Sequence, residues 1–125
     1  MKAGDTFYLP DPSADGHLWV IISDPEKDAD RVLFVSMTSY DVDKEDVCLI
    51  QAGEHPRVTH TTCIHYKLTR HSSLEILDRL RDTGYLRVQP PVSEDVLRRI
   101  RRGASLSKRI DFEYIELMGE QDLLD

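Results

Sequence analysis

Two short apolar segments, rich in β-branched and aromatic residues, constrain the fold of this chain more than any other feature. They are HLWVIIS at residues 17–23 and VLFVSM at residues 32–37. Both have the length of buried strands and are too short for typical helices. Polar turn sequences flank them, PDPSADG before the first and DPEKDAD between the two. The two segments therefore predict neighbouring antiparallel strands.

Three further segments predict strands: Gly4–Leu9, Asp46–Gln51 and Thr61–Leu68. Each is bounded by proline, glycine or charged residues, and the loops between them are short. Strands at this spacing predict a small antiparallel barrel or a strongly bent sheet.

Helical signals appear only after residue 71. Ser72 and Glu75 have the S-x-x-E spacing of a capping box, which predicts a helix that ends near Gly84. A second helix is predicted from Ser93, with acidic residues in its first turn and arginines before Gly103. The fold class is therefore mainly β with appended helices (α+β). Residues 1–110 are expected to form a single domain with two C-terminal helices.

Composition excludes several classes of protein. The chain has 125 residues, a formal net charge of −7 and two cysteines, and no apolar run is long enough for a membrane span. Its N-terminus lacks a basic segment followed by an apolar run, so we expect a cytoplasmic protein with reduced thiols. Cys48 and Cys63 lie in apolar segments and are expected to be buried.

The charge is distributed unevenly along the chain. Residues 57–110 carry 12 basic and 5 acidic side chains, whereas residues 1–56 carry 4 basic and 12 acidic ones. The acidic balance opposes nonspecific nucleic-acid binding, but a local basic face could still bind phosphates. Alternatively, the charges alternate in space once the chain is folded.

The last 15 residues, 111–125, carry six acidic side chains and several apolar ones. This composition is too apolar for a solvated tail and fits either an edge strand or a docked helix. We expect the tail to pack on the domain or on a dimer mate, with its acids near the upstream arginines, where it would compete with nucleic acid. The alternative is a frayed terminus.

Polar side chains at two strand ends form the main candidate site. His17 opens the second predicted strand, and Thr38 and Ser39 follow the third. Because consecutive antiparallel strands bring the start of one beside the end of the next, these residues should meet at one rim. An imidazole can transfer protons near neutral pH, and a hydroxyl can bind a phosphate or a developing oxyanion. Alternatively, these are ordinary rim and turn residues.

Several histidines between residues 55 and 71 raise the possibility of a metal site. Zinc needs three or four nitrogen or sulfur ligands, and His55, His60 and His65 with Cys63 could be considered. The spacing lacks a second close pair of ligands, so we expect strand histidines, no metal and no cofactor.

Four segments of the chain resemble the MazF/PemK toxin family. They are GDTFYLP near the N-terminus, HLWVIISDP, VLFVSMTS and, further on, PPVSEDVLRRI, and together they span roughly residues 4–104. The resemblance implies an SH3-like antiparallel barrel, usually dimeric. It further implies a metal-independent endoribonuclease that cleaves single-stranded RNA and is held inactive by a cognate antitoxin.

The family cleaves RNA with an arginine at the start of the second strand and a threonine or serine at the end of the third. Thr38 and Ser39 match the second position, but His17 stands where the arginine would be. We expect His17 to transfer protons, Thr38 and Ser39 to position the phosphate, and His60 to supply a second imidazole. Cationic contacts to RNA are expected from Arg57, Arg70, Arg98, Arg99, Arg101 and Arg102. The alternative is a catalytically inactive barrel that binds protein or nucleic acid in a toxin–antitoxin or defence complex.

Overall fold

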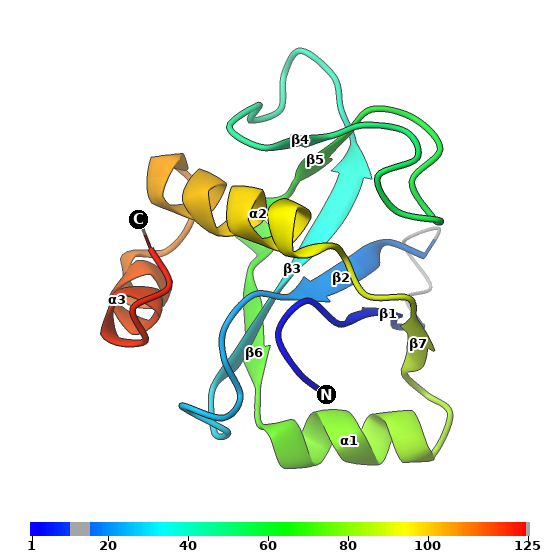
Figure 1. Ribbon diagram of the computed structural model, residues 1–125, viewed down its shortest axis with the longest axis vertical. Coiled ribbons are helices and arrows are strands. Elements are labelled where there is room, and N and C mark those ends of the chain that lie inside the picture. The colour runs from blue at the N-terminus through cyan, green and yellow to red at the C-terminus, as the bar shows by residue number, and fades with distance from the viewer. Residues whose placement is uncertain (11–15, 125) are drawn as a thin grey trace.

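The computed structural model describes residues 1–10 and 16–124. In this part of the chain, seven short strands form one antiparallel sheet and three α-helices lie against it (Figure 1). The strands are β1 (Thr6–Tyr8), β2 (Leu18–Ile21), β3 (Val32–Ser39), β4 (Leu49–Ile50), β5 (Thr62–Ile64), β6 (Arg70–Ser72) and β7 (Arg87–Gln89). The helices are α1 (Leu74–Asp82), α2 (Glu94–Leu106) and α3 (Phe112–Glu120), with a short 3-10 helix, η1, at Tyr66–Leu68. None of the helices described is long and apolar enough to cross a membrane.

Strand β3 is the centre of the sheet. One of its edges pairs with β2, while the other pairs with β6 near its start and with β5 near its end. The strand order is β4-β5-β3-β2-β1-β7, with β6 beside β3. The α+β class is thus confirmed. Of the two predicted alternatives, a small antiparallel barrel and a bent sheet, the structure has a sheet that is not closed into a barrel, because the terminal strands β4 and β7 do not pair with each other in the described structure.

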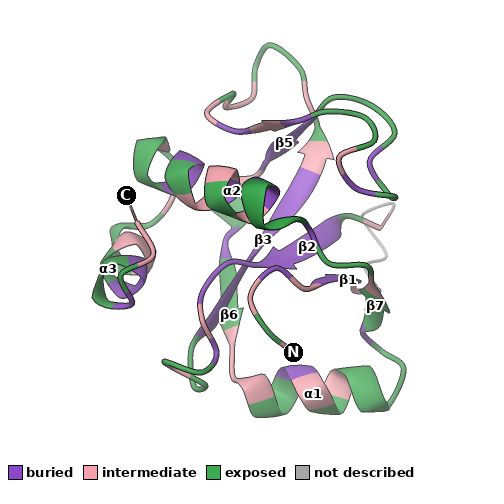
Figure 2. Cartoon of the chain, viewed as in Figure 1, coloured by how far each residue is buried: buried purple, intermediate pink, exposed green. Residues whose placement is uncertain are grey.

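Both faces of the central strands are buried, which explains their continuous apolar sequences (Figure 2). Alternate residues contribute to two separate clusters. The first cluster contains Leu18, Val20 and Val35 and is covered by residues of α2 and α3. The second contains Trp19 and Phe34 and is covered by α1. The sheet therefore lies between helices on its two sides.

Helix α1 begins one residue later than the sequence predicts. Its N-cap is Ser73, whose side chain accepts a hydrogen bond from the Ile76 backbone NH. Ser72 cannot cap the helix because it is still in β6, paired with Val32. The Ser72–Glu75 capping box is therefore wrong by one position.

Helix α2 has the predicted N-cap, Ser93, which accepts a hydrogen bond from the Val96 NH. It does not end at Gly103 but continues to Leu106. Gly103 is buried against the side chains of Tyr66 and Cys48. Gly103 therefore allows α2 to pack closely against these side chains and does not end the helix.

The acidic tail contains a third helix, in addition to the two predicted. Leu117 and Met118 of α3 are buried in the first cluster. Beyond the helix, Gln121 accepts a hydrogen bond from the Asp24 NH at 2.8 Å, and Lys27 Nζ donates to the Gln121 carbonyl at 2.6 Å. The described part of the tail is thus held by apolar packing and hydrogen bonds.

Candidate active site

A hollow of about 400 Å³ opens where β2 begins and β3 ends. Five of the predicted site residues line it: His17, Thr38, Ser39, Arg57 and His60. The rest of its lining is Tyr8, Gly16, Leu18, Met37, Val58 and Thr62. Residues from two strand ends and from the loop between β4 and β5 thus meet in one open space.

Antiparallel pairing places His17 at this hollow. Trp19 is opposite Ser36 in the β2–β3 register, so the residues two positions further out, His17 and Thr38, lie at the same rim. The ring nitrogen Nδ1 of His17 is 3.1 Å from the Met37 carbonyl oxygen. A carbonyl oxygen only accepts, so Nδ1 carries the hydrogen. In the neutral ring, Nε2 then keeps its lone pair and is available as a base.

His60 is held between two hydroxyl groups. Its Nε2 is 2.6 Å from Ser39 Oγ, and its Nδ1 is 3.2 Å from Thr59 Oγ1. A hydroxyl can donate to a ring nitrogen or accept from its NH. The surroundings of His60 therefore accommodate both the neutral and the doubly protonated ring.

Lys44 adds a cation that the sequence analysis did not identify. Its Nζ donates to the Ser39 carbonyl at 2.6 Å and lies 3.4 Å from Thr38 Oγ1. The same ammonium is 3.4 Å from Asp41 Oδ2. The only signal in the sequence was its position in the turn that follows the third predicted strand.

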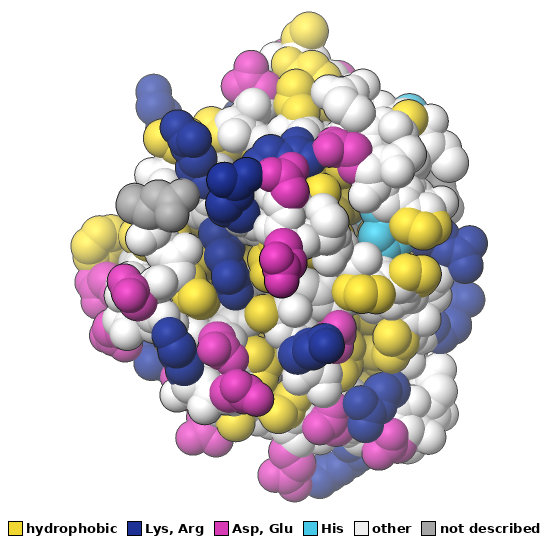
Figure 3. All heavy atoms as spheres, in the orientation of Figure 1, with side chains coloured by type: hydrophobic (Ala, Val, Ile, Leu, Met, Phe, Trp, Pro, Cys, Tyr) yellow, Lys and Arg dark blue, Asp and Glu magenta, His cyan; other side chains and the backbone are white. Residues whose placement is uncertain are grey.

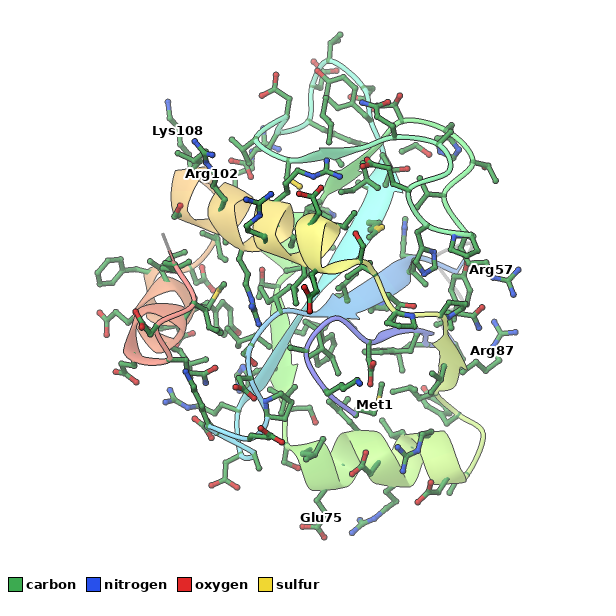
Figure 4. The ribbon with its side chains drawn as sticks, in the orientation of Figure 1. Met1, Arg57, Glu75, Arg87, Arg102 and Lys108 are labelled. Atoms are coloured by element: carbon green, nitrogen blue, oxygen red, sulfur yellow. The ribbon has the colours of Figure 1, made fainter. Side chains whose placement is uncertain are left out.

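Two arginines lie at the edge of the sheet beside the hollow (Figure 4). Arg57 Nε donates to Gln89 Oε1 at 2.8 Å, and the guanidinium of Arg87 lies 5.6 Å from the centre of the Tyr8 ring. The space-filling view shows basic side chains at this edge (Figure 3). Arg87 was missed because its strand, β7, has no apolar alternation.

His55 is buried and supports the loop that carries Arg57. Its Nδ1 accepts a hydrogen bond from the Arg57 backbone NH at 3.0 Å, and Nε2 donates to the Pro90 carbonyl at 2.5 Å. Thr6 Oγ1 is 3.4 Å from the same Nε2. Both nitrogens are thus occupied by structural contacts. Within residues 1–10 and 16–124, no group of three or more His, Cys, Asp or Glu side chains is placed to hold a metal ion.

The structure does not bring Arg70 to the hollow. Its guanidinium lies 4.9 Å from the centre of the Trp19 ring, and Arg70 pairs with Phe34 near the start of β3, whereas the hollow lies at the end of that strand.

The four arginines of α2 also lie elsewhere, and three of them have intramolecular partners. Arg98 and Arg99 pair with Asp95, and Arg99 also pairs with Glu54. Arg101 donates to the Ile22 carbonyl at 2.8 Å. Arg102 is exposed near the C-terminal end of α2 (Figure 4).

The tail acids that the structure describes form no ion pair with the arginines of α2, near which we expected them to lie. None of the ion pairs found there joins a carboxylate of residues 111–124 to an arginine. Figure 3 shows instead that acidic side chains lie among the basic ones over α2. The helix α3 lies on the opposite side of the molecule from Arg57 (Figures 1 and 4).

Neither cysteine is available as a nucleophile. Cys48 and Cys63 are free thiols and are buried, as expected. Burial raises the pKa of Cys48 to about 11, and it also raises the pKa of Cys63. Both side chains are therefore neutral near pH 7.

Comparisons of this chain with protein-family models, curated proteins and solved structures find no match. The resemblance to the MazF/PemK family consequently rests on the four sequence segments alone.

Proposed function

We propose that this protein is a metal-independent endoribonuclease that cleaves single-stranded RNA in the cytoplasm. The observation that carries the proposal is that two imidazoles, His17 and His60, line one open hollow together with the Arg57 guanidinium. Cleavage of RNA next to its 2′-hydroxyl needs a base, an acid and a cation, and these three groups supply them.

The reaction is an internal transfer of the phosphate. The 2′-oxygen forms a bond to phosphorus while the bond from phosphorus to the 5′-oxygen breaks, which leaves a 2′,3′-cyclic phosphate and a 5′-hydroxyl. His17 takes the proton of the 2′-hydroxyl at Nε2, because its Nδ1 is engaged with the Met37 carbonyl. His60, whose two hydroxyl neighbours tolerate the protonated ring, gives a proton to the departing 5′-oxygen.

The remaining polar groups position the phosphate and balance its charge. Thr38 and Ser39 line the hollow together with the two imidazoles and Arg57, and the Lys44 ammonium lies 3.4 Å from Thr38 Oγ1. Donors and cations that are already in place stabilise the extra negative charge of the transition state. Because one imidazole must be neutral and the other charged, the rate should show a bell-shaped dependence on pH.

The test is incubation of purified protein with a long single-stranded RNA, followed by mapping of 5′-hydroxyl ends. We expect cleavage in the presence of EDTA, and a decrease of about 10²–10⁴-fold in the His17→Ala variant. His71→Ala is the matched control, since His71 is exposed on β6 and its ring contacts Tyr114 instead of the hollow. Equal rates for the wild-type and His17→Ala proteins would refute the assignment of His17.

A second candidate is a catalytically inactive module that binds RNA or a protein partner such as an antitoxin. It is favoured by the histidine at position 17, where the family it resembles has an arginine, and by the ion pairs that occupy Arg98 and Arg99. No cleavage under any condition, together with RNA binding or a stable partner in a pull-down, would select this function.

A further inference from the structure

A smaller cavity, of about 70 Å³, adjoins the hollow. Thr38 lines both spaces. The small cavity is further lined by Lys44, His65 and Arg109, and its floor includes Cys63 and Tyr66. A water-sized group needs about 10–15 Å³ of such space, so the cavity has room for about five atoms, the number of heavy atoms in a phosphate group.

Two cationic side chains, Lys44 and Arg109, line this cavity beside His65. Burial is the main cause of the lowered pKa of His65, and the charges that add to it are all cationic: His17, Lys44, Arg109 and Lys67. His65 is therefore kept neutral, so one of its nitrogens can donate and the other can accept. Among the residues described, none hydrogen-bonds the His65 ring, which leaves both nitrogens for a ligand.

Glu45 is the one acidic side chain in the lining, and its carboxylate is already engaged. Its Oε1 accepts from Ser107 Oγ at 2.7 Å, and its Oε2 accepts from the Lys108 backbone NH at 2.8 Å. These bonds fix the segment that carries Arg109 beside the cavity. Glu45 thus holds the segment that carries Arg109, and its single negative charge stands against two cations in the lining, Lys44 and Arg109.

We propose that this cavity is a second phosphate subsite, which binds the RNA phosphodiester next to the one that is cleaved. The inference rests on the proposed function and deepens it: the RNA backbone would pass over Thr38, with one phosphate in the hollow and the next beside Lys44 and Arg109. The substrate is then a strand with at least two consecutive phosphodiesters, and Arg109 is a binding residue with no part in the chemical step.

The experiment measures binding, with RNA that cannot be cleaved. Labelled 2′-O-methyl RNA lacks the free 2′-hydroxyl, and a dinucleotide with one phosphodiester is compared with a hexanucleotide. We expect Arg109→Gln to weaken hexanucleotide binding about 5–20-fold and to leave dinucleotide binding within about twofold. The slope of log affinity against log salt concentration should become less steep by about 0.7 for the lost phosphate contact.

Lys108→Gln is the matched control, because it removes the same charge from the neighbouring exposed residue, which does not line the cavity. Its hexanucleotide affinity and salt dependence should equal those of the wild type. Equal losses in the Lys108 and Arg109 variants would overturn the subsite and indicate diffuse surface charge. An Arg109→Gln variant that weakens dinucleotide binding by the same factor as hexanucleotide binding would also overturn it. This binding assay does not depend on cleavage. A protein that fails to cleave RNA but shows the expected dependence on RNA length would therefore refute the proposed nuclease activity and still support the subsite.

Discussion

The ring of His55 is buried, and each of its nitrogens has a backbone partner, the Arg57 NH on one side and the Pro90 carbonyl on the other. His55 does not line the hollow, but its two hydrogen bonds join the loop that carries Arg57 to the segment after β7. Sequence reasoning could consider His55 only as a possible metal ligand, because its partners are 2 and 35 residues away in the chain.

We expect His55→Ala to lower the free energy of unfolding by about 1–3 kcal/mol, since it removes a buried ring, leaves the Arg57 backbone NH without its partner and leaves the Pro90 carbonyl with Thr6 Oγ1 alone. His55→Gln should recover part of this loss, because an amide both accepts and donates. Urea unfolding of the two variants measures the difference. An alanine variant as stable as the wild type would show that water replaces the ring at no cost.

His65 gives the stability of the protein a pH dependence of known sign. Its pKa is lowered in the folded chain from an ordinary value of 6.5, mainly by burial and then by the neighbouring cations. Below pH 6.5, down to the folded pKa, the unfolded chain binds more protons, so stability falls as the pH falls. We expect the unfolding free energy measured in urea between pH 7.5 and about 5 to decrease less in His65→Gln than in the wild type. Parallel curves for the two proteins would contradict this.

At the scale of elements, the segments that could be predicted are those whose signal is local. The apolar sequences of β2 and β3 and the N-cap Ser93 are signals of this kind, and the structure confirms them. The meeting of His17 with Thr38 followed from the pairing of consecutive strands.

The elements that were missed depend on distant partners. The strands β6 and β7 are three residues each and mostly exposed, so they have no alternating pattern. In the segment Thr61–Leu68 the strand ends at Ile64, because Tyr66 begins the 3-10 helix η1. The Tyr66 hydroxyl donates to the Ile100 carbonyl at 2.6 Å. By contrast, the i,i+3 and i,i+4 spacing of Asp95 to Arg98 and Arg99 was visible in the sequence, and it shows why these arginines are partly neutralised.

The contact between α2 and η1 gives a prediction at this scale. A Cβ atom at Gly103 would collide with Tyr66 Oη and lie 2.9 Å from Cys48 Cβ. We therefore expect Gly103→Ala to destabilise the protein by about 1–3 kcal/mol. Gly119→Ala in α3 is the matched control, because nothing lies within 4 Å of its Cβ position, and it should stabilise by about 0.5–1 kcal/mol. Thermal unfolding of both variants measures this, and a shift of the same sign in both would be inconsistent with tight packing at Gly103.

At the scale of the whole molecule, α3 completes the first core cluster. Leu117 is 3% exposed, whereas Phe112 of the same helix is 72% exposed. We expect Leu117→Ala to cost about 2–5 kcal/mol and Phe112→Ala to stay within about 0.5 kcal/mol of the wild type. Denaturant unfolding measures both. Equal stability of the two variants would mean that the helix is not docked in solution.

The pairing of β1 with β7 has a consequence for how the protein folds. Thr6 Oγ1 donates to the Pro90 carbonyl, 84 residues further along the chain, and His55 donates to the same oxygen. Closing so long a loop is slow, because its entropy is lost before the contacts form. During synthesis, every residue that lines the hollow leaves the ribosome before Pro90 does, yet the loop of Arg57 gains its anchor only when that proline arrives. A nascent chain would therefore carry all the groups of the hollow without their final geometry, and the hollow would assemble only after most of the protein had been made.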